Sequence, residues 1–80
     1  MALQHVQLNR HQRRKAARHF LRIGDVAERT GLSKAQIYAM VAKGIFPRQA
    51  KLAARCSGWD SHEIEEWAEA KLAERDEAAA

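Results

Sequence analysis

The stretch from Val26 to Val41 constrains the fold of this chain more than any other. The small residue Ala27 stands four positions before Gly31, and apolar residues follow the glycine one, six and nine positions later, at Leu32, Ile37 and Met40. A glycine makes the tight turn between two short helices, a small residue lets them approach, and apolar positions lock the second against the first. This spacing predicts a helix-turn-helix, a motif whose second helix usually lies in the major groove of DNA.

Local signals set the ends of these two helices. The first is predicted to start near Gly24 and to end at Gly31, which supplies a left-handed turn residue. The second starts at Ser33, because Ser33 and Gln36 satisfy the capping-box pattern, and it ends at Lys43 before a C-terminal Gly44. Helical spacing buries Ile37, Met40 and Val41. The side chains left exposed are those of Lys34, Ala35, Tyr38, Ala39 and Ala42, with Gln36 at the border.

The second half of the chain predicts a hairpin and a third helix. Pro47 cannot continue a helix, and Phe46 before it is expected to anchor the sheet. Residues 50–52 and 57–59 are predicted as two short strands of weak β-propensity. A second capping-box pattern at 60–63 starts a helix that runs roughly from 61 to 75, with 76–80 frayed. Its expected apolar stripe is Ile64, Trp67, Ala68 and Leu72, and its acidic face is Glu65, Glu66, Glu69 and Glu74.

The segment before this domain, residues 1–19, is expected to be a mobile basic arm. Its basic side chains are Arg10, Arg13, Arg14, Lys15 and Arg18. We expect the arm to lie along phosphates or in a groove of a nucleic acid and to add affinity without sequence preference; the alternative is a solvated tail with no role. Phe20, Leu21 and Ile23 then enter the domain and are expected to pack under the first helix.

The distribution of charge points to a polyanionic partner. Residues 1–59 hold 12 Lys and Arg against 2 Asp and Glu, giving +10, whereas residues 60–80 hold 2 against 8, giving −6. A basic body with an acidic end suggests nucleic acid on one side only. The chain of 80 residues forms one domain at most, no apolar run has the length of a membrane span, and the single Cys56 excludes an internal disulfide. We therefore expect a cytoplasmic, nucleoid-associated protein.

The sequence shows no arrangement of residues typical of a catalytic site or a metal site. The four histidines share no metal-ligand spacing with one another or with Cys56, and the four glycines are scattered at turns and form no phosphate-binding loop. The carboxylates after residue 60 are typical of an exposed helix face. The sequence predicts no enzyme, no metal and no cofactor.

Taken together, several motifs resemble the AlpA-like regulators. The motifs are Phe20-Leu-Arg-Ile, Val26-Ala27, Thr30-Gly-Leu-Ser33, Ile37-Tyr38, Gly44-Ile-Phe-Pro47, Lys51-Leu52, Arg55, Gly58-Trp59 and Glu63-Ile-Glu-Glu-Trp67. These regulators are small prophage-encoded DNA-binding proteins related to phage excisionases and to the MerR-type winged helix-turn-helix domain. The resemblance covers about residues 20–75. It implies a mainly α fold with a small β-hairpin wing and three core helices.

The resemblance also implies a set of DNA-binding residues. Ser33, Lys34, Ala35, Gln36 and Tyr38 lie where the family reads DNA, and Arg48, Lys51 and Arg55 lie where the wing contacts phosphates; from the arm we add Arg13, Arg14 and Lys15. Ala35 replaces a hydroxyl residue or arginine common in the family, and 53–54 at the wing tip replace a common glycine or proline.

Each of these side chains has an alternative interpretation. Gln36 and Lys34 can read adenine and guanine edges, or Gln36 can only close the capping box while Lys34 is solvated. Tyr38 can bond a phosphate or be partly buried against the wing. Arg55 at the wing tip can contact a phosphate or the minor groove, or remain a solvated loop arginine.

Three functions are compatible with these sequence features. The first is a sequence-specific transcriptional regulator of a prophage or mobile element. The second is an excisionase that bends attachment-site DNA, and the third is a protein-interaction module that uses its acidic last helix. The expected partners are duplex DNA, an integrase or RNA polymerase, and further copies of the chain side by side on DNA.

Overall fold

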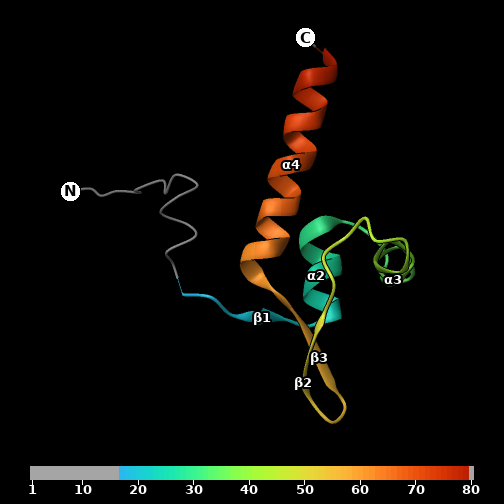
Figure 1. The fold of residues 1–80 in the computed structure, drawn as a ribbon, viewed down its shortest axis with the longest axis vertical. Coiled ribbons are helices and arrows are strands. Elements are labelled where there is room, and N and C mark those ends of the chain that lie inside the picture. The colour runs from blue at the N-terminus through green and yellow to red at the C-terminus, as the bar shows by residue number, and fades with distance from the viewer. Residues whose placement is uncertain (1–16, 80) are drawn as a thin grey trace, which may run out of the picture.

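The computed structural model describes residues 17–79 and is mainly α with a small β wing, an arrangement consistent with a winged helix-turn-helix (Figure 1). The elements in chain order are β1 (Phe20–Leu21), α2 (Ile23–Thr30), α3 (Lys34–Ala42), β2 (Ala50–Ala53), β3 (Cys56–Asp60) and α4 (Ser61–Ala79). Figure 1 shows α2 and α4 running up the page while α3 is seen end-on beside them. The hairpin of β2 and β3 projects from the end opposite to the tip of α4.

The turn between α2 and α3 is built as predicted. Gly31 adopts φ 78° and ψ 5°, which is the left-handed region, and its N–H donates to the Ala27 carbonyl at 2.8 Å. The preceding Thr30 adds a link that the sequence pattern does not predict: its hydroxyl donates to the Val26 carbonyl at 2.7 Å and accepts from the Leu32 N–H at 3.2 Å. Both bonds hold the chain as it leaves α2, so the direction of α3 is fixed locally.

The sheet has three antiparallel strands in the order β1-β3-β2. The predicted hairpin is confirmed, with Ala50 opposite Gly58, and both strands are slightly longer than expected. Strand β1 was not predicted; it pairs Leu21 with Trp59. The expectation that Phe20 packs under the first helix is wrong. Side chains alternate along a strand, so Leu21 is 3% exposed while Phe20 is 50% exposed.

The core receives one buried side chain from every element except β2, and another from the loop after α3. Its buried side chains are Leu21, Val26, Ile37, Phe46, Trp59 and Ile64. Partly buried apolar residues surround them, namely Ile23, Ala27, Leu32, Met40, Val41 and Trp67. The predicted anchor Phe46 and the predicted inward residues of α2 and α3 are thereby confirmed. A core this small leaves a narrow margin of stability, so single backbone or packing changes should be measurable.

Helix α4 starts where the sequence predicts but runs further. The Asp60 carboxylate accepts the N–H of His62 at 3.2 Å at its start, and the helix continues to Ala79 instead of ending near residue 75. Residues 76–79, which we expected to fray, are helical because the last turns consist largely of Ala, Glu, Lys, Leu and Arg, which are strong helix formers. Leu72 was predicted on the buried stripe and is instead 51% exposed, since this part of α4 extends past the rest of the domain (Figure 1).

The residues just before β1 are attached to the start of α4. The Ser61 N–H donates to the His19 carbonyl at 2.9 Å, and the His19 N–H donates to the Ser61 hydroxyl at 3.2 Å. Arg18 adds an ion pair to Asp60 at 3.2 Å. Domain contacts thus begin before Phe20. The arm residues Arg10, Arg13, Arg14 and Lys15 lie outside the described residues.

A glycine pair in this motif offers a matched test of stability. We expect Gly31→Ala to lower the free energy of unfolding by about 1–2 kcal/mol, because an L-residue is strained in the left-handed region although nothing lies within 4 Å of the added methyl group. Gly24→Ala in α2 also meets nothing within 4 Å and should instead be neutral or stabilising. Urea denaturation followed by circular dichroism measures both. Equal effects would contradict the role assigned to Gly31.

Candidate nucleic-acid interface

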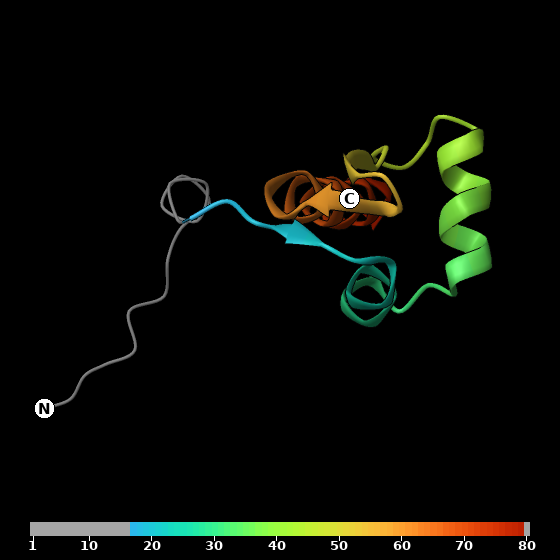
Figure 2. The ribbon, with the colours of Figure 1, turned by 90° about the horizontal axis from the view of Figure 1, so that it is seen from below.

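Helix α3 lies at one edge of the molecule with one side turned outward (Figure 2). The inward side of α3 carries Ile37, which is fully buried, and Met40 and Val41, which are half-buried. The outward residues at its start and along it are Ser33, Lys34, Ala35, Gln36, Tyr38, Ala39 and Ala42, all exposed. Three of them are alanines, so the centre of this face is slim and nearly free of hydrogen-bonding side chains.

The first turn of α3 carries the predicted capping box. The Gln36 N–H donates to the Ser33 hydroxyl at 3.1 Å, and the Ser33 N–H donates to the Gln36 side-chain oxygen at 3.0 Å. The amide oxygen of Gln36 therefore caps the N-terminal end of the helix, while its NH₂ group has no protein partner among residues 17–79. Lys34 begins the helix between these two residues and is exposed.

Tyr38 connects α3 to the wing. Its ring lies 6.1 Å from that of Trp59, centroid to centroid, at an interplanar angle of 54°, and 47% of the residue stays exposed. Partial burial against the wing is thus what the structure shows. The exposed half remains on the outward side of the molecule.

Two tryptophans hold the loop that leads from α3 to the wing. The Trp59 indole N–H donates to the Pro47 carbonyl at 2.8 Å, and the Trp67 indole N–H donates to the Ile45 carbonyl at 3.3 Å. Between these bonds Phe46 packs edge-on against Trp67, with ring centroids 4.8 Å apart. The exposed Arg48 follows directly after this anchored loop, so its backbone position is fixed relative to α3.

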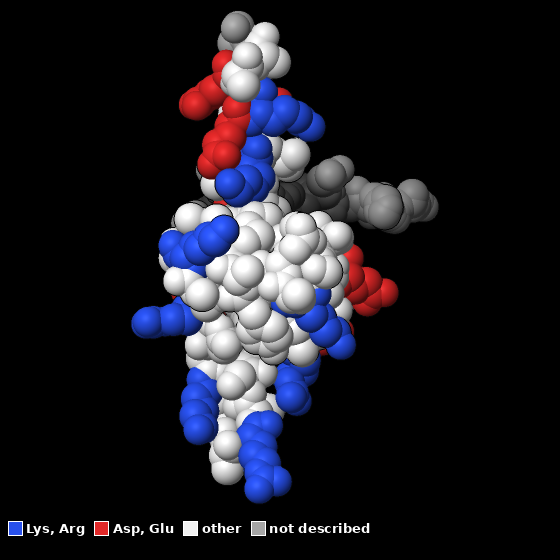
Figure 3. Space-filling model, turned by 90° about the vertical axis from the view of Figure 1, so that its right-hand side faces the viewer, with Lys and Arg blue, Asp and Glu red and all other residues white. Residues whose placement is uncertain are grey.

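The wing carries the remaining predicted cations. Lys51 lies on β2 opposite Ser57, and Arg55 lies in the turn between the strands; both are exposed. Figure 3 shows Lys and Arg side chains around a largely uncharged face and along the hairpin, whereas Asp and Glu gather mainly along α4. The exposed Lys43 at the C-terminal end of α3 belongs to this basic border; sequence reasoning missed it, because the residue was interpreted only as a helix end.

Other kinds of site are not evident in the described part of the chain. No group of three or more His, Cys, Asp and Glu residues in 17–79 is arranged to hold a metal ion. Within the same residues, no helix is both long enough and apolar enough to cross a membrane.

The helix-turn-helix, the hairpin and the basic border together define the class as a small domain consistent with a winged helix-turn-helix. Comparison with known proteins agrees. Residues 19–72 match the family described as prophage CP4-57 regulatory protein (AlpA), and the chain belongs to this family. The resemblance noted in the sequence is thereby confirmed.

One curated relative comes from a phage. The chain is 36% identical over 56 residues to an uncharacterized protein, ORF88, of Enterobacteria phage P4. The match covers 70% of this chain and 64% of that protein, so it spans less than two thirds of the relative's length. No solved structure gives a significant match. The family is one of phage-associated regulatory proteins, and the relative is itself encoded by a phage.

The two indole hydrogen bonds predict unequal effects of the same substitution. Trp59→Phe should lower the free energy of unfolding by about 1–3 kcal/mol, because the buried indole is removed and the Pro47 carbonyl is left without its partner. Trp67→Phe should cost less, since its bond is longer and lies on the exposed side. Urea denaturation monitored by the helical circular dichroism signal separates them. A larger destabilisation by Trp67→Phe would contradict this ranking.

Proposed function

We propose that this chain is a sequence-specific duplex DNA-binding regulator of a prophage or mobile element, acting in the cytoplasm on the nucleoid. Helix α3 enters the major groove and the hairpin covers the neighbouring backbone. The observation that carries the proposal is the outward face of α3, which is slim at Ala35 and Ala39 and bordered by exposed basic residues. B-form DNA admits an α-helix in its major groove and attracts such a border through its phosphates. Family membership supports the regulatory role.

Few side chains on α3 are equipped to read bases. The exposed Lys34 can donate to a guanine edge, and the NH₂ group of Gln36 remains a donor for a base while its oxygen closes the capping box. Ala35 offers only a methyl contact to thymine. Ser33 is engaged as the cap, and Tyr38 is held against Trp59 with its exposed half available to a phosphate.

Much of the affinity is therefore electrostatic. Arg48, Lys51 and Arg55 are exposed around the wing, and Arg13, Arg14 and Lys15 of the arm add further cations. Each phosphate they neutralise releases condensed counterions, so binding weakens as salt rises. A module with so few base contacts gains useful specificity from a second copy side by side, or from an integrase or RNA polymerase bound next to it.

The wing is tested through the salt dependence of binding. Lys51→Ala with Arg55→Ala should weaken binding to every duplex and reduce the slope of log K against log salt by about 0.9 for each phosphate that is no longer neutralised. Lys71→Ala with Arg75→Ala is the matched control, because these two exposed cations lie along α4 and pair with neighbouring carboxylates of that helix. Fluorescence anisotropy over a range of salt concentrations measures the slope. An unchanged slope in the double variant would remove the wing from the interface.

Base reading is tested at the first turn of α3. Gln36→Ala would remove the cap and the amide together, whereas Gln36→Glu keeps an oxygen for the Ser33 N–H and removes the donor. The double variant Lys34→Ala with Gln36→Glu should reduce the preference for the native site over a scrambled duplex by about tenfold, since one good base contact is worth about 1–3 kcal/mol. Footprinting upstream of the chain's own gene identifies that site. An unchanged preference would place base reading elsewhere.

The two other candidate functions are separated by simple outcomes. An excisionase would protect arrays of sites beside an attachment core, and excision would be lost when its gene is deleted. A transcriptional regulator would protect a promoter and alter transcription while excision stays intact. A chain that shows no duplex binding even at low salt would instead be a protein-interaction module acting through α4.

A further inference from the structure

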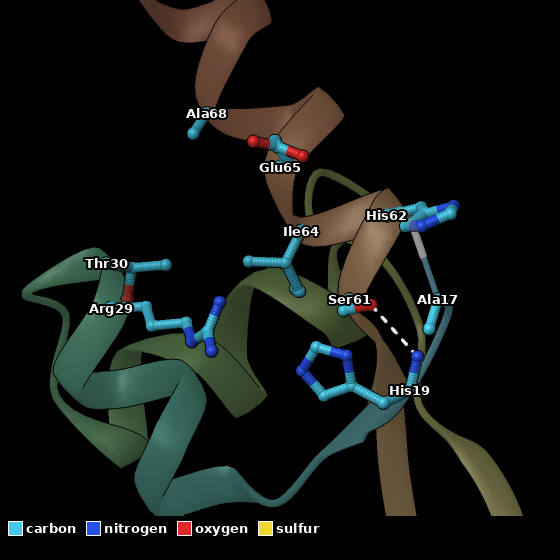
Figure 4. Close-up of a pocket in the computed structure, with 9 residues that line it drawn as sticks. All are labelled: Ala17, His19, Arg29, Thr30, Ser61, His62, Ile64, Glu65 and Ala68. Atoms are coloured by element: carbon cyan, nitrogen blue, oxygen red, sulfur yellow. Dashed lines mark hydrogen bonds between the residues drawn. The ribbon is translucent and has the colours of Figure 1, made fainter. Parts of the chain in front are cut away.

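A groove lies between α2, the first turns of α4 and the segment that precedes β1 (Figure 4). Its volume is about 410 Å³. Ala17, Ile64 and Ala68 give it an apolar lining, and Figure 4 shows Ile64 pointing into the space between α2 and α4. Glu65 stands on the α4 wall of the same groove.

The apolar stripe of this wall continues beyond the groove. Leu72 follows Ala68 by one helical turn and is 51% exposed, although α4 presents the same face there. Glu65 and Glu69 flank this stripe. The α4 wall thus offers apolar surface beside two carboxylates, and it is complementary to a segment that is both apolar and basic.

The chain itself supplies such a segment at the edge of the groove. Ala17 is the first described residue and lines the groove, so the chain that precedes it is joined to the domain at this point. Residues 10–16 hold four basic side chains and no acidic one, and residues 1–8 hold Leu3, Val6 and Leu8. Seven extended residues reach at most about 24 Å, whereas Glu65 to Leu72 spans about 10 Å of helix.

We propose that residues 1–16 dock on α4 of the same chain when no nucleic acid is bound. The basic side chains of 10–15 pair with Glu65 and Glu69, and apolar residues of the segment cover Leu72 and Ala68. The opposite wall carries Arg29 and Thr30 of α2, and His19 lies at the edge of the groove; none of these side chains offers a negative charge. The cations of the segment therefore lie along the α4 wall and not along α2.

This docking has a consequence that rests on the proposed function. The same basic side chains are the ones expected to grip phosphates, and they cannot serve both surfaces at once. The carboxylates of α4 then compete with DNA phosphates for the arm. This competition reduces binding to duplexes of arbitrary sequence more than binding to the native site. On an arbitrary duplex α3 makes few base contacts, so little binding energy is available to displace the arm from α4.

The docking is tested first without DNA. Trypsin cleaves after Arg13, Arg14 and Lys15, and a docked segment is protected in proportion to the docked population. Glu65→Gln with Glu69→Gln should raise the cleavage rate by about two- to thirtyfold, the range that two exposed ion pairs supply. Glu74→Gln with Glu77→Gln is the matched control, with the same charge change further along α4, and should leave the rate unchanged. Mass spectrometry follows the products at each site.

Two results would overturn the proposal. One is an equal cleavage rate in the chain and both variants at low salt. The other is protection that grows with protein concentration, which would place the segment on a second copy. Circular dichroism checks that each Gln variant retains its helix content, so a faster rate cannot come from unfolding of α4.

A second measurement connects docking to DNA binding. On a duplex of arbitrary sequence, Glu65→Gln with Glu69→Gln should bind more tightly than Glu74→Gln with Glu77→Gln. Removal of residues 1–16 should abolish that difference, while keeping Arg18 and His19 in contact with the start of α4. If the cleavage results hold but no variant binds duplex DNA, the docking stands and the proposed function falls. If binding is normal but cleavage is equal in all variants, the docking alone falls.

Discussion

The hydrogen bond from the Trp59 indole to the Pro47 carbonyl is the interaction on which the geometry of this domain depends. Trp59 is 1% exposed and belongs to β3, the central strand, while Pro47 belongs to the loop that leaves α3. The same ring supports Tyr38 on α3. One side chain therefore sets the distance between the outward helix and the wing. A protein that contacts two neighbouring parts of a duplex needs that distance fixed before it binds, since ordering it afterwards would cost affinity.

Much of the fold could be predicted because its signals are local. The capping box at Ser33, the left-handed Gly31 and the helix start after Asp60 each depend on residues within one turn of one another. The wrong or missing predictions concern features that depend on contacts between residues far apart in the sequence. Strand β1 is two residues long and exists only through its pairing with β3, so nothing within it indicates a strand. Leu72 has the right period, but periodicity does not tell how far the core extends beneath a helix.

The candidate site divides in the same way. Helical spacing is enough to identify which side chains of α3 face outward. It does not reveal that the Gln36 oxygen is engaged in the cap or that Tyr38 rests on Trp59, because these depend on rotamers and on a residue distant in sequence. The places of Arg48, Lys51 and Arg55 depend on the two tryptophans and on the register of the hairpin, neither of which a pattern of residue types specifies.

If α3 reads DNA as proposed, the reciprocal cap at its start also limits how this protein can acquire new targets. A position that must accept the Ser33 N–H tolerates a short repertoire of side chains, essentially Gln and Glu in a capping box. Substitutions that change specificity are then expected at neighbouring positions whose side chains do not stabilise the fold, such as Lys34, Ala35 and Ala39. Relatives that share this cap would diversify at those three positions while the geometry of docking stays the same, and a library aimed at retargeting the helix would start there.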